Sequence, residues 1–245
     1  MNMEEIYQRE RIIGPSVSDA AGLLGVPDAF GLCMDIAAMH AEALGVGFRA
    51  LAERDLFWLT VKTQLRFLRR PRMMETALLR TWPEAPGKAR GDRSYALYCG
   101  GALCVCGKTE WAVLNTKTRH MTPMKEVFPA DLRFTQPSAC PAPYARIPDD
   151  FGGTPAYAQY RVRSTDIDVG MHMNNTAYVR AIFGSLSTAE RDALPAGRVD
   201  VSFRSPCYEG DLLQFQRRET EAGTDFRLSR DGETVLLARV AALEE

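Results

Sequence analysis

The sequence lacks an excess of charge of either sign, since 30 lysine and arginine residues are balanced by 31 aspartate and glutamate residues among 245. General binding to nucleic acids requires surplus cations that displace counterions from phosphates. We therefore expect no nucleic-acid partner. Hydrophobic residues make up 46% of the chain and charged residues 25%, as in ordinary globular proteins. This composition excludes a fibrous or largely disordered chain.

Long hydrophobic runs are also missing. No stretch approaches the roughly 18–20 consecutive apolar residues that cross a bilayer, so we expect no membrane span. Residues 1–14 contain no apolar core of the kind found in secretory signals. On both grounds we expect the protein to be cytoplasmic.

The six cysteines have neither the CxxC spacing nor the clustered histidines that are typical of a metal site. In a chain of this size without a secretory signal, reduced thiols are expected rather than a disulfide framework. We therefore predict small buried side chains at all six positions, which are Cys33, Cys99, Cys104, Cys106, Cys140 and Cys207.

Proline is sparse outside one stretch, because half of the 14 prolines lie between residues 123 and 155. Proline removes a backbone donor and fixes φ, so such a stretch continues neither a helix nor a central strand. We predict an N-terminal domain over residues 1–125, a proline-rich linker over residues 126–154 and a C-terminal domain over residues 155–245.

The two halves repeat one order of elements, a helix followed by several strands. Apolar residues at helical spacing predict a helix from Val26 to about Leu44, and a shorter helix is expected near residues 175–186. Gly100-Gly101 and Asp231-Gly232 favour tight turns between strands. We predict an α+β fold with two similar antiparallel subdomains. The expected strands cover residues 56–67, 74–82, 93–99 and 102–115, then 156–163, 198–204, 212–219, 224–230 and 234–243.

Polar residues crowd the junction between a predicted strand and the second helix. Asp168, His172, Asn174 and Asn175 fall where the first N–H groups of a helix lack partners within the helix. Such N–H groups can stabilise an oxyanion, and a carboxylate near an imidazole can fix its tautomer. The alternative is structural, with an asparagine capping the helix and Asp168 closing the loop.

Residues 166–178, DIDVGMHMNNTAY, resemble the D-x-D-x-x-x-H-x-N-N-x-x-Y signature of hotdog-fold thioesterases. With FWLT at 57–60, GKTEWAVLNTKTR at 107–119, Phe203 and Gly210-Asp211, the chain resembles the acyl-ACP thioesterase family from about residue 5 to 243. The resemblance implies two tandem hotdog subdomains, each an antiparallel sheet wrapped around a central helix.

The same resemblance implies an enzyme of lipid metabolism. Its activity would be hydrolysis of the thioester between a fatty acyl chain and acyl carrier protein, without a metal or organic cofactor, in a monomer or homodimer. Asp168 and His172 carry over as catalytic residues. The N-terminal domain would hold the acyl chain, with Phe30, Met34 and Trp58 lining the pocket, although core packing explains these three as well.

Two positions depart from the family pattern. Gly170 stands where the family usually has asparagine, and Pro206 stands where it usually has glutamate. Cys207, as a nucleophile, or Glu209, as a base that activates water, could substitute for the missing group. If neither does, the chain binds acyl groups with weak or lost hydrolysis. A further alternative is an acyl-CoA thioesterase using the same residues.

Other polar residues have structural and functional interpretations. His40 lies on the apolar face of the first helix, where we expect a core or pocket-lining histidine. Tyr178 is expected to pack rather than to act in catalysis. Four arginines, at positions 66, 69, 70 and 72, form either a solvated loop or a docking patch for the acidic carrier protein.

Overall fold

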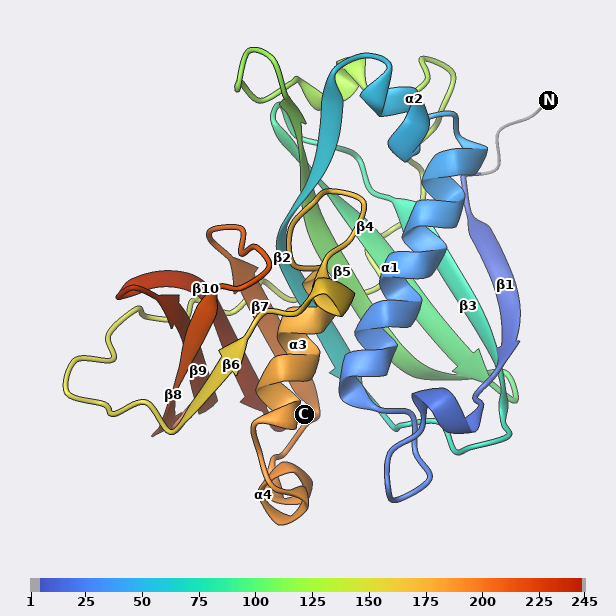
Figure 1. Cartoon of the computed structure of the whole chain (residues 1–245). Helices are drawn as coiled ribbons and strands as arrows, with labels where there is room; N and C mark the ends of the chain where they lie inside the picture. The colour runs from blue at the N-terminus through green and yellow to red at the C-terminus, as the bar shows by residue number, and fades with distance from the viewer. Residues whose placement is uncertain (1–4, 244–245) are drawn as a thin grey trace. The chain divides into compact units, whose positions relative to one another are not determined.

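The computed structural model describes residues 5–243, and the chain divides into two units, one ending at Ala142 and the other beginning at Pro143. Each unit contains one antiparallel sheet and one longer helix, as Figure 1 shows. Among the described residues, none of the helices combines the length and apolar character that a bilayer crossing needs.

The N-terminal sheet has the strand order β1-β3-β4-β5-β2, with every neighbouring pair antiparallel. Helix α1 (Val26–Ala43) lies across one face of this sheet, and the short helix α2 (Phe48–Ala52) follows it (Figure 1). The strands are β1 (Tyr7–Ile12), β2 (Leu56–Phe67), β3 (Thr76–Pro83), β4 (Arg90–Cys99) and β5 (Ala102–Asn115).

Local sequence explains the ends of these elements. Pro27 occupies the first turn of α1, where its missing N–H costs nothing, and Gly45 follows the helix with a φ of 70°. Gly100 and Gly101 turn β4 into β5 with φ values of 57° and 79°, which confirms the predicted Gly-Gly turn.

The C-terminal sheet has the order β7-β10-β9-β8-β6, again antiparallel throughout. Asp231 and Gly232, with φ values of 52° and 83°, form the predicted turn between β9 and β10. The elements are β6 (Ala158–Arg161), α3 (Asn175–Gly184), α4 (Thr188–Ala193), β7 (Arg198–Phe203), β8 (Leu212–Thr220), β9 (Gly223–Arg230) and β10 (Glu233–Ala241).

The predicted helices and strands are present, and the α+β class is confirmed. Strand β1 and helix α2 were not expected. The β1 segment YQRERI consists mostly of polar residues, five of the six are exposed, and its sequence shows no alternation of apolar side chains. Backbone pairing with β3 defines it as a strand. Such edge strands carry little periodic signal in their side chains.

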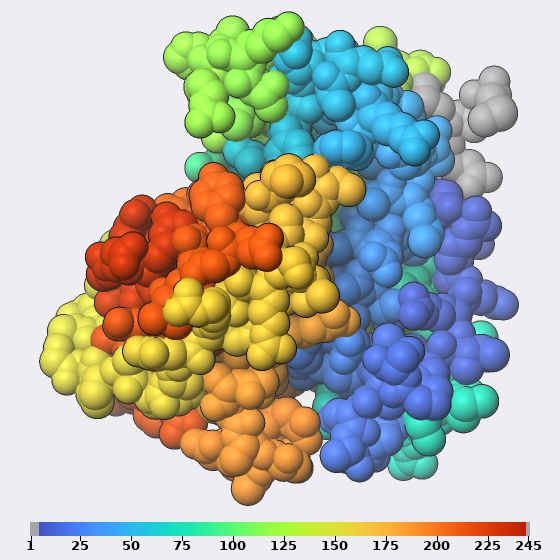
Figure 2. All heavy atoms as spheres, in the orientation of Figure 1, coloured from blue at the N-terminus to red at the C-terminus, as the bar shows by residue number. Residues whose placement is uncertain are grey.

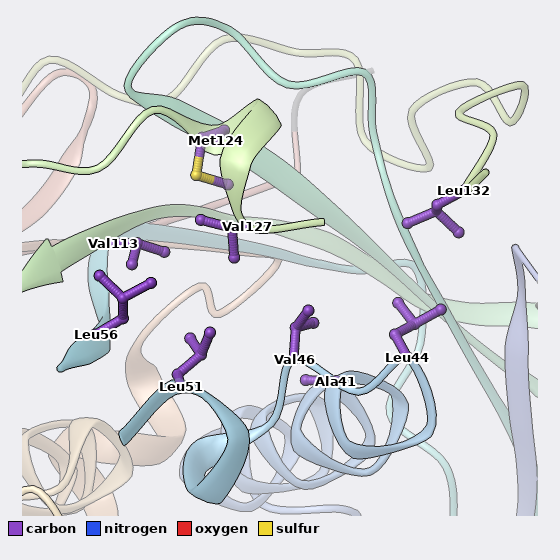
Figure 3. Packing of buried hydrophobic residues seen from close by; sticks show 9 residues of the cluster. All are labelled: Ala41, Leu44, Val46, Leu51, Leu56, Val113, Met124, Val127 and Leu132. Atoms are coloured by element: carbon purple, nitrogen blue, oxygen red, sulfur yellow. The ribbon is translucent and has the colours of Figure 1, made fainter. Parts of the chain in front are cut away.

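The proline-rich stretch has neither helix nor strand from residue 127 to 157, but its side chains complete both cores. Figure 3 shows the N-terminal cluster, in which Met124, Val127 and Leu132 from the start of this stretch meet residues of α1, α2 and two strands. Farther along, Ile147 and Phe151 pack on Leu237 of the C-terminal unit. The boundary between the units falls between these two attachments.

Candidate active site

A short hairpin places Asp168 and His172 opposite each other. Ile167 and Met173 form an isolated antiparallel bridge, and inside it the Asp168 N–H donates to the His172 carbonyl at 3.1 Å. The Met171 N–H closes the turn on the Asp168 carbonyl at 2.9 Å, and Met171 has a φ of 59°. The backbone therefore brings the predicted acid and histidine together.

The tip of this hairpin is solvent-exposed. Val169 and Met171 are 70% and 74% exposed, which is unusual for large apolar side chains. In Figure 2 the gold atoms of the segment around residues 163–172 lie on the surface of the molecule. The hairpin is thus accessible, whereas Met173 at its base is buried and anchors it.

The Asp168 carboxylate holds the hairpin against helix α3. It accepts hydrogen bonds from the Gly170 N–H at 2.8 Å and from the Asn174 side-chain amide at 3.2 Å. Asn174 in turn caps α3, because its Oδ1 accepts from the Thr176 N–H at 2.8 Å. Asn174 therefore has two roles. Its side-chain oxygen caps the helix, and its side-chain NH₂ group donates to the Asp168 carboxylate.

The imidazole of His172 is half-buried, and its Nδ1 lies 3.3 Å from the Met173 carbonyl oxygen. A carbonyl oxygen only accepts, so this contact is a hydrogen bond when Nδ1 carries the proton. Nε2 is then the basic nitrogen. The side-chain hydrogen bonds of Asp168 go to Gly170 and Asn174, so its carboxylate fixes the loop that carries the imidazole.

At the start of α3, two of the backbone N–H groups already have acceptors within the protein. The Asn174 N–H donates to the Asp166 carbonyl at 2.8 Å, and the Thr176 N–H is used by the cap. Asn175 is the first residue of the helix. What the helix start retains is the partial positive charge of the helix dipole, which favours a developing oxyanion nearby.

Cys207 is next to the hairpin through its backbone. Its carbonyl accepts from the Met173 N–H at 2.7 Å, and its N–H donates to the Tyr178 hydroxyl at 2.9 Å. The residue is 0% exposed, and burial raises the pKa of its thiol despite the nearby Tyr178 hydroxyl and Arg230 charge. A protonated, buried thiol is a poor nucleophile.

Tyr178 packs in the core, as expected from the sequence, but its hydrogen bond to the backbone of Cys207 was not predicted. It is buried on α3, packs edge-on against Phe203 and fastens the loop that follows β7 through the Cys207 N–H. Its position four residues after Asn174 was the available signal, but the partner lies 29 residues away in the chain.

Glu209 is exposed in the same loop, at a turn in which the Asp211 N–H donates to the Tyr208 carbonyl at 3.1 Å. Within residues 5–243 its side chain makes no hydrogen bond or ion pair. Arg230 fixes the loop by donating to the Pro206 carbonyl at 3.1 Å and to Asp211 at 2.6 Å. No hydrogen bond brings the Glu209 carboxylate or the Cys207 thiol to His172 among these residues.

The three residues predicted to line an acyl pocket lie in the N-terminal unit, and they differ in environment. Phe30 is buried on α1, and Met34 is half-buried one turn later. Trp58, on β2, donates to the Val46 carbonyl at 2.8 Å and packs against Phe128, with ring centroids 5.9 Å apart. Trp58 thus contacts the core cluster of Figure 3.

The predicted arginine patch is partly neutralised. Arg69 forms an ion pair with Glu75 at 2.8 Å, and Arg70 forms one with Asp19. These pairs reduce the positive potential that a docking surface for an acidic protein would need.

Comparison with known proteins decides the family. A model of the acyl-ACP thioesterase N-terminal domain matches residues 4–132, and a model of the C-terminal domain matches residues 153–241. The chain belongs to the acyl-ACP thioesterase family. The resemblance noted in the sequence is thereby confirmed, and the hairpin with Asp168 and His172 lies in the C-terminal domain of this family of thioester hydrolases.

Acyl-ACP thioesterases also appear among the individual relatives. A chloroplastic acyl-[acyl-carrier-protein] hydrolase of Cuphea viscosissima is 24% identical over 221 residues, covering 84% of this chain and 51% of the relative. The chloroplastic oleoyl-acyl carrier protein thioesterase 1 of Arabidopsis thaliana is 21% identical over 203 residues, covering 74% and 55%. The chain therefore spans about half the length of the curated relatives it matches.

Solved structures show the same fold. An acyl-ACP thioesterase from Bacteroides thetaiotaomicron superposes with a TM-score of 0.87 at 22% identity, covering 97% of each chain. The 12:0-ACP thioesterase from Umbellularia californica superposes with a TM-score of 0.84 at 18% identity, again over 97% of each chain. The prediction of two tandem hotdog subdomains is confirmed.

Proposed function

We propose that this protein hydrolyses the thioester that joins a fatty acyl chain to acyl carrier protein, releasing the free fatty acid. The observation that supports this most is the hairpin that sets Asp168 opposite His172, with the Asp168 carboxylate bonded to Asn174, the cap of α3. A rigid acid–histidine–amide arrangement at a helix start suits acyl transfer.

In the proposed mechanism, Nε2 of His172 takes a proton from water while the water oxygen attacks the thioester carbonyl carbon. The negative charge on the carbonyl oxygen develops near the positive end of α3. Collapse of the tetrahedral intermediate breaks the carbon–sulfur bond, and the imidazolium returns the proton to the leaving thiolate. Asp168 and Asn174 keep the hairpin in place throughout.

The roles of Cys207 and Glu209 remain predictions with unequal support. Burial and the raised pKa of the Cys207 thiol oppose a nucleophilic role. Glu209 is exposed and could accept a proton, but no contact within the described residues holds it near His172. We therefore assign the activation of water to His172 alone.

We further propose that the N-terminal unit binds the acyl chain, with Phe30, Met34 and Trp58 among the residues it meets. The helix–sheet arrangement of that unit supports this, because α1 lies across one face of the sheet (Figure 1) and its buried side chains include Phe30. Acyl carrier protein is the proposed partner that delivers the chain.

The test is hydrolysis of purified fatty acyl-ACP, followed by release of free thiol. We expect His172→Ala to lower kcat by about 10²–10⁴-fold, the usual contribution of a general base. His120→Ala is the matched control, because His120 is exposed and lies in the N-terminal unit. Full activity in both His172→Ala and Asp168→Ala would refute the assignment.

Gly170 and Pro206 favour a second candidate, a protein that binds acyl groups but hydrolyses them poorly. Gly170 does not take a positive φ, so asparagine is sterically compatible with its backbone. If Gly170→Asn together with Pro206→Glu raises a low native turnover, the native chain is a weakened enzyme. Equal turnover of acyl-CoA and acyl-ACP, with no binding of the apo carrier protein, would instead favour an acyl-CoA thioesterase.

A further inference from the structure

A group of polar side chains lies between α1 and the N-terminal sheet, where an apolar core is expected. Arg93 and Tyr95 are two residues apart on β4, and so share one face of the sheet. In the register with β5, Thr109 pairs with Arg93 and Trp111 pairs with Gly91, so both lie on that same face. Arg93 contacts His40 of α1, which shows that this is the face the helix covers.

Arg93 is a buried cation without an anionic partner. It is 6% exposed, and its Nη1 lies 3.0 Å from His40 Nδ1 and 3.3 Å from Thr81 Oγ1. Within residues 5–243 no carboxylate forms an ion pair with it. Burial lowers the pKa of Arg93 to about 10, so the side chain still carries its charge at neutral pH. A buried charge that lacks a counter-charge is costly and rare.

The groups around Arg93 include one acceptor and two further donors. Arginine only donates, so Nδ1 of His40 accepts this hydrogen bond and carries no proton. The Tyr95 hydroxyl and the Trp111 indole nitrogen are buried and lie near each other and near Thr109, but neither completes a hydrogen bond of normal geometry among the described residues. Tyr95 is 2% exposed, and burial raises the pKa of its hydroxyl, which keeps the proton on it. Arg93, Tyr95 and Trp111 thus all present polar hydrogens.

Mostly apolar residues lie beside Tyr95. A cavity of about 10 Å³ there is lined by Cys33 and Ile36 of α1 and, on the sheet, by Leu79, Arg80, Ala96, Leu97 and Val105. The space admits little more than one water in this conformation. A chain that entered it would have to part α1 from the sheet, as in a closed form that opens on binding.

We propose that this cluster, the Arg93 site, binds a carboxylate or another oxygen acceptor carried on an aliphatic chain. The apolar walls suit methylene groups, and Arg93, Tyr95 and Trp111 supply donors to an anionic oxygen group at the end of the chain. The inference rests on the proposed function in one respect. It assigns the substrate class as acyl chains that bear an oxygen group far from the thioester.

The direct test compares two ligands that differ only at one end, methyl octanoate and monomethyl octanedioate. Calorimetric titration of the full chain measures both affinities and requires no hydrolysis. We expect the carboxylate-bearing ester to bind at least about tenfold tighter, in line with a charge-assisted hydrogen bond. Equal affinity for the two esters would overturn the inference.

Variants test which residues cause the preference for the carboxylate-bearing ester. Arg93→Met should abolish it, and Tyr95→Phe should reduce it several-fold. Arg90→Met is the matched control, since Arg90 lies on the same strand but is exposed and pairs with Glu110. If Arg93→Met fails to fold, Tyr95→Phe still decides, because that change removes only a hydroxyl that lacks a hydrogen bond of normal geometry. A preference that survives in a folded Arg93→Met or is unchanged in Tyr95→Phe would contradict the site.

Different results would refute the proposed function and the Arg93 site. Preference for the carboxylate ester without hydrolysis of any acyl thioester would refute the proposed function and leave the Arg93 site standing. Hydrolysis of unsubstituted fatty acyl-ACP without such a preference would refute the Arg93 site alone. Hydrolysis of a carrier-bound acyl chain ending in a carboxylate, in preference to the unsubstituted chain, would support both.

Discussion

Asn174 has two separable roles, and substitution can remove either one. Its Oδ1 accepts from the Thr176 N–H at 2.8 Å and caps α3, while its Nδ2 donates to Asp168 at 3.2 Å. Asn174→Ser keeps an oxygen for the cap and removes the amide donor. Asn174→Ala removes both. The two variants together separate stability from positioning of the carboxylate.

The magnitudes follow from these contacts. Loss of an asparagine cap costs about 1 kcal/mol, with a range of about 0.5–2. For a unit of this size that lowers Tm by roughly 4–8 °C. The bond to Asp168 is long and its carboxylate is half-exposed, so we assign it about 1.4 kcal/mol of positioning, or a tenfold loss of kcat.

Urea denaturation and acyl-ACP hydrolysis measure the two effects. We expect Asn174→Ser to unfold within a few tenths of a kcal/mol of the native protein and to lose about tenfold in kcat with little change in KM. Asn174→Ala should show the same loss of kcat and the full loss of stability. If the serine variant is as active as the native protein, the reasoning that Asn174 positions Asp168 is wrong.

Three further outcomes are expected. Tyr178→Phe leaves the Cys207 N–H buried without an acceptor and should cost about 1–3 kcal/mol in urea unfolding, whereas Tyr157→Phe, whose hydroxyl is exposed, should cost under about 0.5. Iodoacetamide at about pH 8 should leave Cys207 unmodified in the folded protein and label it in urea, as measured by mass spectrometry. Rapid labelling of the folded protein would contradict the burial of this thiol and its raised pKa. Burial raises the pKa of Asp211, but the Tyr208 N–H and Arg230 outweigh it and hold that pKa below the ordinary 3.8. The native protein should therefore be more stable than Asp211→Asn by a constant amount above the ordinary pKa. This difference should disappear as pH falls through the lowered pKa of the folded state, which Tm measurements would show.

Much of the fold was predictable because it depends on neighbours in the chain. The strands predicted at 56–67 and 102–115 match the observed β2 and β5, and the predicted Gly-Gly turn joins β4 to β5. Turn glycines and helix caps act within three or four residues, so their signal is local. The same holds for the Asp168–His172 spacing, which sets a five-residue hairpin loop.

Other features depended on packing between distant parts of the chain. Nothing near Cys207 indicated that its N–H would meet Tyr178, 29 residues away, or that its thiol would be buried. Arg93 and His40, 53 residues apart, became partners only when α1 covered the sheet. Alternation and helical spacing show which face of an element is apolar, but the groups that share a buried volume are decided when the elements pack together. The positions of Asp168 and His172 were thus readable from the chain, whereas the partners of the Asp168 carboxylate and the donors of the Arg93 site came from the tertiary structure.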